Sequence, residues 1–245
     1  MSIFAIADLH LSFANPKPMD IFGNNWTNHE AKIREDWISK VKGDDLVLLP
    51  GDFSWAMNLE DSYKDFEYLN SLPGRKIMLK GNHDYWWNSL KKLKEFLDKN
   101  EFKNIDFLYN NAFEFENKII VGTRGWNLIS NDENNEKVLR RELIRLELSI
   151  TKGTESFGED KEIIVCMHYP PTNKSLLENS EFIKLMQKYN VTKCIYGHLH
   201  GESHKDAVEG YIGGIDVKLV SSDYLEFKLC EVGMEKIVQS WMHIY

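Results

Sequence analysis

Short apolar runs rich in β-branched residues alternate along the chain with amphipathic stretches. Apolar residues at helical spacing predict helices over Glu30–Val41, Leu90–Leu97 and Glu136–Ile150. The apolar runs predict strands at Ile3–Ala7, Leu46–Leu49, Lys76–Leu79, Ile119–Gly122, Ile163–Met167 and Lys193–Tyr196. Strands that alternate with helices in this way are typical of a layered α/β domain.

Two segments depart from this alternation. Phe113–Phe115 and Ile119–Val121 flank Asn117-Lys118, and this order predicts a β-hairpin in mid-chain. Near the end of the chain, we expect antiparallel strands with little helix from the alternating runs Ile215–Val220, Tyr224–Cys230 and Lys236–Trp241. The whole pattern favours two sheets packed face to face with helices outside, rather than one doubly wound sheet.

Composition and charge narrow the class of protein. With 245 residues, 42% of them hydrophobic, and no repeat or linker, the chain suits a single domain over residues 1–245. No run approaches the ~20 apolar residues that cross a bilayer, and the apolar start is too short for a signal peptide. We therefore expect a cytoplasmic protein without a membrane partner. The net charge of −8 argues against broad contact with long nucleic acid, and the oligomeric state is left open.

Asp, Asn and His residues gather where the apolar runs stop. In open α/β sheets, the loops at the carboxyl ends of the strands converge on the ligand, so these side chains should meet at one edge. Gly-His-x-His should occur by chance roughly 0.016 times and Gly-Asn-His-Asp roughly 0.003 times in a chain of this composition. Both are present here. The clusters are Asp8-Leu9-His10, Gly51-Asp52, Gly81-Asn82-His83-Asp84, His168 and Gly197-His198-Leu199-His200.

Seven residues of these clusters offer three oxygen and four imidazole ligands: Asp8, His10, Asp52, Asn82, His168, His198 and His200. This mixture suits a borderline divalent ion, with manganese expected first and iron, zinc, cobalt or nickel as alternatives. Seven ligands exceed what one tetrahedral ion needs, whereas two ions that share a bridging carboxylate would use them all. A turn opened by Gly197 could direct His198 to one ion and His200 to the other.

The ordered set resembles the signature of the calcineurin-like metallophosphoesterase superfamily, which reads D-x-H, GD, GNH-D/E, H and GH-x-H. Every block is present between residues 8 and 200, as in a bacterial-type phosphohydrolase branch. The resemblance implies an α/β fold, a four-layer α/β/β/α sandwich of two mixed β-sheets flanked by helices. After Asp52 the chain continues as Phe53-Ser54-Trp55, where the superfamily's protein serine/threonine phosphatases have a further Asp and Arg, and this departure disfavours a protein phosphatase.

Carried over residue by residue, the resemblance implies a dinuclear metal centre. One metal would be bound by Asp8, His10 and His200 and the other by Asn82, His168 and His198, with Asp52 as the bridge. The implied catalytic residues are His83, which would protonate the leaving group, and Asp84, which would hold His83. Arg124, which follows the run Ile119–Gly122, is a candidate to bind a phosphate oxygen, although a surface arginine is the alternative.

Two such ions would clamp an in-line displacement at phosphorus, with a hydroxide that bridges them as the nucleophile. The ions outweigh the carboxylates and the hydroxide by about one positive charge, so a globally acidic protein can present a local phosphate trap. We therefore expect a phosphatase or phosphodiesterase for a small phosphomonoester or phosphodiester, nucleotide-like esters included. The alternatives are a nuclease, which the acidic charge disfavours, and a scaffold protein on the same fold, which the complete ligand set disfavours.

Overall fold

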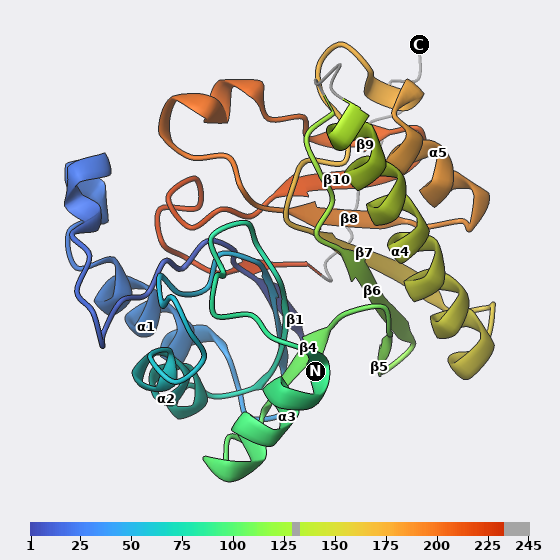
Figure 1. Ribbon diagram of the computed structural model, residues 1–245. Coiled ribbons are helices and arrows are strands. Elements are labelled where there is room, and N and C mark those ends of the chain that lie inside the picture. Colours follow the sequence, from blue (N-terminus) through green and yellow to red (C-terminus); the bar gives the residue numbers. More distant parts are fainter. Residues whose placement is uncertain (129–132, 233–245) are drawn as a thin grey trace, which may run out of the picture.

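The computed structural model describes residues 1–128 and 133–232, whose strands form two mixed β-sheets (Figure 1). The first sheet has the order β11 (Cys230–Glu231), β1 (Ile3–Ala5), β2 (Leu46–Pro50), β3 (Arg75–Leu79) and β4 (Ile105–Leu108). The second has the order β5 (Phe113–Phe115), β6 (Lys118–Thr123), β7 (Glu162–Met167), β8 (Lys193–Tyr196), β10 (Ile215–Leu219) and β9 (Gly210–Ile212). Neighbours within β1–β4 and within β6, β7, β8 and β10 are parallel, whereas β11, β5 and β9 are antiparallel edges.

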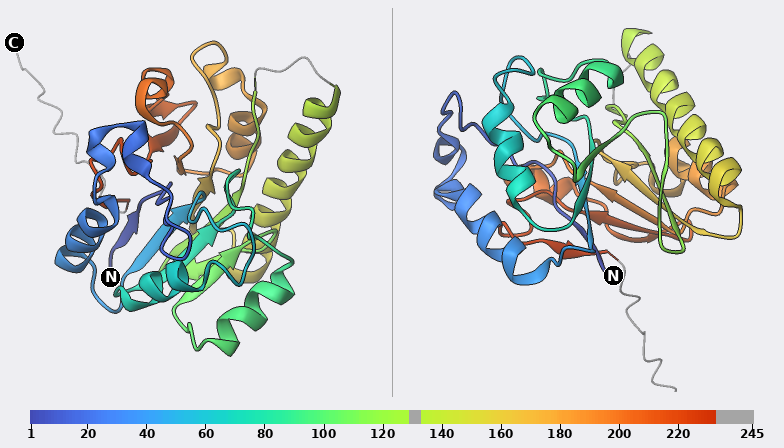
Figure 2. Two further views of the ribbon diagram at one scale, coloured as in Figure 1. Left: turned by 60° about the vertical axis from the view of Figure 1, so that its left-hand side comes forward. Right: turned by 90° about the horizontal axis from the view of Figure 1, so that it is seen from below.

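Helices cover the outer faces of both sheets (Figure 2). The first sheet is covered by α1 (His29–Lys40), α2 (Tyr63–Ser71) and α3 (Leu90–Lys99), and the second by α4 (Glu133–Phe157) and α5 (Glu181–Lys188). Short 3-10 turns interrupt the loops at Met19–Phe22, Asn24–Trp26, Leu177–Asn179 and Gly201–Asp206. No helix in the two described ranges combines the length and the apolar character that crossing a membrane requires.

Three apolar layers hold the four structural layers together. Successive residues of a strand face opposite sides, so Ile3 and Ala5 pack between the sheets while Phe4 packs against the helices of the first sheet. In the second sheet, Ile164 faces the first sheet and Val165 faces α4 and α5. Because both faces of each central strand are buried, these strands are apolar at nearly every position.

The predicted two-sheet sandwich and its mid-chain hairpin are confirmed. The predicted strand at Tyr224–Cys230 is wrong, because Glu226 and Phe227 take positive φ angles of 53° and 61° and turn the chain before the short strand β11 begins. There the apolar spacing reflects packing of Phe227 and Leu229 beside the helices. The run Ile215–Val220 does form a strand, β10, which pairs antiparallel with β9 as expected but parallel with β8 on its other side. The strand predicted at Lys236–Trp241 lies outside the described residues.

Candidate metal centre

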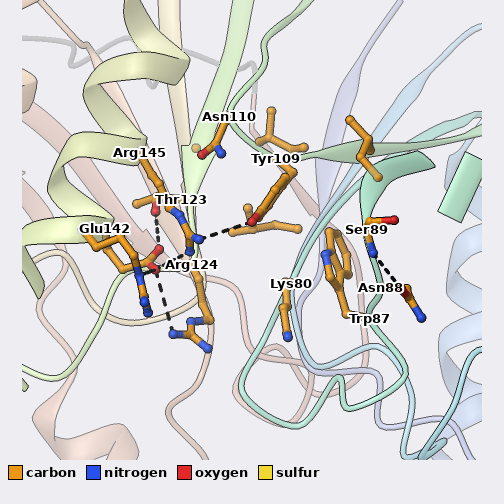
Figure 3. A pocket seen from close by; sticks show the side chains of 15 residues that line it. Lys80, Trp87, Asn88, Ser89, Tyr109, Asn110, Thr123, Arg124, Glu142 and Arg145 are labelled. Atoms are coloured by element: carbon orange, nitrogen blue, oxygen red, sulfur yellow. Dashed lines mark hydrogen bonds and ion pairs between the residues drawn. The ribbon is translucent and has the colours of Figure 1, made fainter. Parts of the chain in front are cut away.

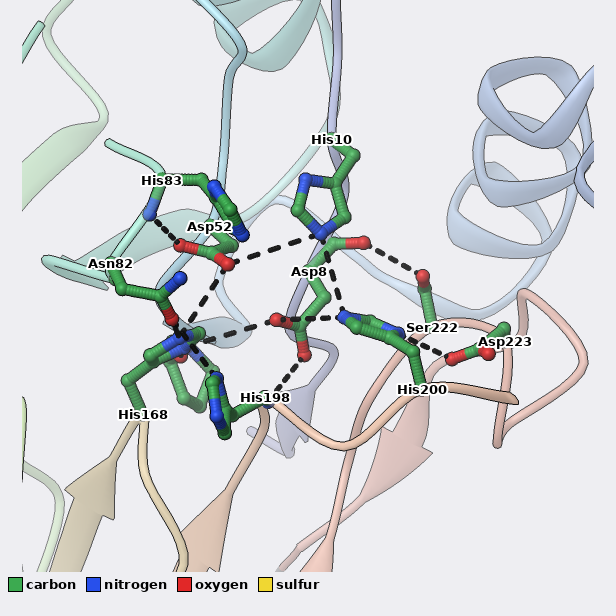
Figure 4. Close-up of polar contacts among 12 residues, drawn as sticks. Asp8, His10, Asp52, Asn82, His83, His168, His198, His200, Ser222 and Asp223 are labelled. Carbon is green, nitrogen blue, oxygen red and sulfur yellow. Dashed lines mark hydrogen bonds and ion pairs between the residues drawn. The ribbon is translucent and has the colours of Figure 1, made fainter. Parts of the chain in front are cut away.

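The loops that follow β1, β2, β3, β7 and β8 converge at the carboxyl edge of the two sheets, as expected from their shared direction (Figure 4). Backbone hydrogen bonds tie neighbouring loops, with Asp8 N donating to Gly51 O at 2.9 Å and Gly197 N donating to His168 O at 3.1 Å. The convergence brings together all the residues predicted as ligands: Asp8, His10, Asp52, Asn82, His168, His198 and His200.

Several of these residues have strained backbones. Asp8, His10, Asp52 and His198 have φ angles of 61°, 47°, 52° and 74°, a region that residues other than glycine rarely adopt. Each such conformation costs of order 1–3 kcal/mol and persists only where the surrounding structure imposes it. The strain turns the side chains off the strand direction and toward one another, which a continuing strand would not do.

The first group of donor atoms comes from Asp8, His10 and His200. His200 Nε2 lies 3.4 Å from His10 Nε2 and 3.3 Å from Asp8 Oδ1. Ligand atoms about 2.0–2.1 Å from one tetrahedral ion are separated by about 3.4 Å, so these spacings fit a common ion. Asp8 Oδ1 is buried and accepts no hydrogen bond from any described residue, which leaves it free to coordinate.

The second group comes from Asn82, His168 and His198. Asn82 Oδ1 lies 2.6 Å from His168 Nε2 and 2.9 Å from His198 Nδ1. His168 Nδ1 donates to Pro50 O at 3.0 Å, so Nε2 of the neutral ring directs a lone pair at the amide oxygen. Two lone pairs in contact need a cation between them, and burial lowers the pKa of His168, which disfavours a proton there. The second group therefore offers lone pairs for one cation, with donor atoms closer together than the spacing of about 3.4 Å in a tetrahedral ligand set.

Asp52 lies between the two groups. Its Oδ2 is 3.5 Å from His168 Nε2 and 3.9 Å from His10 Nε2. Its Oδ1 accepts a hydrogen bond from His83 N at 2.8 Å, which fixes the carboxylate. The bridging position that the resemblance implies for Asp52 is thus compatible with these distances.

Burial and charge make the protein alone a poor environment for these side chains. Burial, followed by the negative charge of Asp8, raises the pKa of Asp52 to about 8. Burial lowers the pKa of His198 to about 3, so its ring stays neutral with a lone pair to donate. Burial also opposes a charge on His200, but Asp8 and Asp223 outweigh it and raise its pKa to about 10. A divalent ion would ionise Asp52 and displace the proton of His200.

Asp223 is a functional candidate that sequence reasoning missed. Its Oδ1 accepts from His200 Nδ1 at 2.8 Å, which orients the ring so that Nε2 faces the first group. Gly201 N donates to its Oδ2 at 2.9 Å and holds the carboxylate in place. Asp223 comes soon after β10 ends, so the rule that drew attention to the other strand ends could have found it.

The expectation that Asp84 holds the His83 ring is wrong in this geometry. The buried carboxylate accepts five hydrogen bonds, from the backbone N–H groups of Asp52, Phe53, Ser54 and Gly81 and from Trp86 Nε1. Asp84 therefore fixes the two loops that carry Asp52 and Asn82. His83 Nδ1 has no hydrogen-bond partner among the described residues, and its ring lies 4.6 Å from the Trp55 ring and 5.8 Å from that of His10.

Two glycines of the motifs allow the loops to approach this closely. A Cβ on Gly81 would collide with the carboxylate and the backbone nitrogen of Asp52. A Cβ on Gly197 would lie 2.5 Å from Asp8 Oδ2 and 2.7 Å from Ala7 Cβ. Any side chain at either position would push a ligand carboxylate away from the centre.

Arg124 and the loop tryptophans take separate places around the centre. Arg124 O accepts from His168 N at 3.2 Å, while its guanidinium lies beside Glu142 and 4.6 Å from the Trp126 ring. In the described ranges, no hydrogen bond or ion pair joins its side chain to a predicted ligand residue. Trp55 stacks on His10 at 4.8 Å, whereas Trp86 is buried in the core and donates to Asp84.

A two-sheet α/β sandwich with this cluster at its strand ends defines a metallophosphoesterase-type protein. The family model of the calcineurin-like phosphoesterases matches residues 1–202, and the chain belongs to that family. Family membership and the candidate ligand groups together indicate a metal-binding hydrolase of phosphoric esters. No curated protein sequence matches the chain.

Solved structures of low sequence identity share the fold over nearly the whole chain. Phosphopantetheinyl hydrolase (PptH) from Mycobacterium tuberculosis is 13% identical with a TM-score of 0.56, covering 96% of each chain. TT1561 of Thermus thermophilus is 15% identical with a TM-score of 0.56, covering 94% of this chain and 97% of its own. A protein of unknown function from Aquifex aeolicus is 19% identical with a TM-score of 0.50, covering 94% and 95%.

Proposed function

We propose that this protein is a dinuclear, metal-dependent phosphoesterase that hydrolyses a small phosphodiester or phosphomonoester. The observation that carries the proposal is the convergence of donor atoms at two adjacent points. At one, His200 Nε2 lies 3.4 Å from His10 and 3.3 Å from Asp8; at the other, Asn82 Oδ1 lies 2.6 Å from His168 Nε2. Two bound divalent ions would supply a water of lowered pKa and positive charge for the phosphate oxygens.

The protein's own residues would position and protonate the reacting groups. Asp52 faces both ligand groups, so it would keep the two ions together. His83 lies beside the ring of His10, is half-buried, and has an unpartnered Nδ1, so it would act as the acid that protonates the leaving alkoxide. Burial lowers its pKa, so the negative charge of a bound phosphate would be needed to favour the protonated ring. Asp84 would act indirectly, because its hydrogen bonds fix the backbone on either side of the centre.

The first test is hydrolysis of bis(p-nitrophenyl) phosphate and p-nitrophenyl phosphate by metal-free protein reloaded with Mn, Zn, Ni or Mg. We expect turnover to return with metal, most strongly with Mn, and to be absent from Asp52→Asn. The preferred ester decides between a diesterase and a monoesterase. Absence of both bound metal and turnover would support the alternative of a scaffold protein, whereas two bound ions without turnover would indicate a narrower substrate.

The role of His83 has its own test. General acid catalysis contributes about 10²–10⁴-fold, so His83→Ala should slow an alkyl ester with a poor leaving group by about that factor. Nitrophenolate needs little protonation, so nitrophenyl esters should be slowed much less. Equal losses on the two kinds of ester would exclude His83 as the acid.

A further inference from the structure

A basic pocket opens between the carboxyl ends of β3, β4 and β6 and helix α4 (Figure 3). Its volume is about 480 Å³, which is enough for a phosphate and part of the group that carries it. The residues that define the pocket are Lys80, Trp87, Tyr109, Arg124, Arg141 and Arg145. Its cations come from β3, β6 and α4, so the fold rather than one local segment assembles the positive charge.

The positive charge of the basic pocket exceeds its negative charge. One carboxylate, Glu142, serves three arginines, with its Oε1 2.6 Å from Arg145, 3.8 Å from Arg141 and 3.9 Å from Arg124. The other oxygen of Glu142 accepts from Thr123 Oγ1 at 2.7 Å. Lys80 adds a fourth cation, and none of the described carboxylates lies within 4.0 Å of its Nζ. The four cations therefore exceed the single carboxylate by three positive charges.

Two of these cations have donors without an acceptor. Arg124 Nε is buried and makes no hydrogen bond to any residue in the described ranges. The Lys80 side chain is half-buried and points with Arg124 to the same side of the pocket (Figure 3). A buried donor without an acceptor costs free energy, which an anionic ligand would recover through short charge-assisted hydrogen bonds.

The basic pocket shares a wall with the metal centre. Lys80 precedes the ligand Asn82 by two residues, a backbone span of at most about 7.6 Å. Arg124 O accepts from the backbone N–H groups of His168 and Tyr169, at 3.2 and 2.9 Å. The segments that carry Lys80 and Arg124 therefore place the basic pocket next to the metal centre in the fold.

We propose that the basic pocket binds a second phosphate of the substrate while the metal centre holds the phosphate that reacts. This inference rests on the proposed phosphoesterase function and narrows its substrate class to phosphoric esters that carry another phosphate a few bonds away. A nucleoside phosphorylated on both ends of its sugar is one member of that class. Lysine and forked guanidinium groups that line one pocket would bind a phosphate, which has several acceptor oxygens, better than they would bind a neutral group.

The test compares two thymidine p-nitrophenyl phosphodiesters that differ only in whether the other sugar hydroxyl carries a phosphate. For the wild-type protein loaded with metal, the extra phosphate should raise kcat/KM by about tenfold or more, chiefly through KM. Lys80→Met and Arg141→Gln should each bring that ratio close to one. Arg140→Gln is the matched control, because Arg140 is an exposed neighbour on α4 that does not line the pocket, and it should keep the wild-type ratio.

Failure of this inference is distinguishable from failure of the proposed function. A wild-type ratio near one, with both esters hydrolysed, would overturn the pocket assignment and leave the phosphoesterase standing. If neither ester is hydrolysed, calorimetry tests the pocket assignment directly: thymidine bisphosphate is titrated into the protein as isolated. Binding that Lys80→Met and Arg141→Gln weaken about tenfold would support the pocket, whereas binding that is absent or equal in all variants would exclude it.

Discussion

Buried carboxylates lie side by side at the carboxyl edge of the sheets, yet their surroundings are opposite. Asp84 accepts five N–H hydrogen bonds, so every part of its negative charge is matched by a donor. By contrast, Asp8 Oδ1 and Asp52 Oδ2 face imidazole nitrogens, and Asp8 Oδ1 accepts no hydrogen bond from any described residue. The difference separates a carboxylate that holds the protein together from those that are kept free for a cation.

The same difference is visible in the pKa values. Burial, then the charge of Asp52, raises the pKa of Asp84 to about 6, while burial, then the charge of Asp8, raises that of Asp52 to about 8. N–H donors from two loops limit the rise in the pKa of Asp84. Asp52 accepts fewer hydrogen bonds and faces the carboxylate of Asp8, so its pKa rises further. Without a bound cation, the carboxylates that are kept free at this edge therefore lower the stability of the folded protein.

The largest expected effect distinguishes Asp52 from Asp84. Asp52→Asn should abolish metal-dependent hydrolysis, by about 10³-fold or more. It should not lower the stability of the chelated protein, because an amide does not bear the cost of burying an ionisable carboxyl beside Asp8. Asp84→Asn should instead destabilise the chelated protein by about 2–4 kcal/mol, because an amide offers one acceptor oxygen to five donors. Hydrolysis rates of the metal-loaded variants measure the first effect, and urea unfolding in EDTA measures the second. Greater destabilisation by Asp52→Asn than by Asp84→Asn would refute the comparison.

The sequence predicted the sandwich and brought attention to every ligand candidate because each of those residues lies within five residues of the end of an apolar strand. What it could not predict depends on contacts between distant segments. The partners of Asp84 include backbone groups about thirty residues away on another loop, which no spacing reveals. Asp223 lies in the turn between the predicted runs Ile215–Val220 and Tyr224–Cys230, and its role depends on a contact with His200, 23 residues away. The basic pocket is assembled from three strand ends and a helix.

Asp223 adds a third kind of carboxylate to the comparison of Asp52 with Asp84. It orients the candidate ligand His200 but is not itself a candidate ligand. Loss of such a partner typically weakens metal binding by about 10–100-fold, so Asp223→Asn should reduce the affinity of the first ion by that factor while the second ion is retained. Competition with a metal-binding dye measures both affinities. Asp216→Asn is the matched control, since Asp216 lies on β10 and pairs with Lys193 at 3.4 Å. Equal effects of the two substitutions would show that Asp223 has no orienting role.

The smallest effect concerns a buried cation at the opposite end of β3. Lys76 is fully buried, and its Nζ donates to Leu72 O without an ion-pair partner among the described residues. Burial lowers its pKa from 10.5 to about 7, so between these values the folded protein binds fewer protons than the unfolded chain and stability rises with pH. From pH 7 to pH 9 this contributes about 2 kcal/mol to the free energy of unfolding.

Lys76→Met, which keeps the apolar length of the side chain, should remove that pH dependence and stabilise the protein most near pH 7. Urea unfolding of both proteins at pH 7, 8 and 9 isolates the contribution of Lys76, because all other titrating groups are shared. The stability curves should converge as the pH rises toward 10.5. Parallel curves would mean that Lys76 stays charged when buried, held by its single carbonyl acceptor. In that case an unpaired charge is tolerated away from the carboxyl edge as well, and incomplete pairing alone would not identify a ligand.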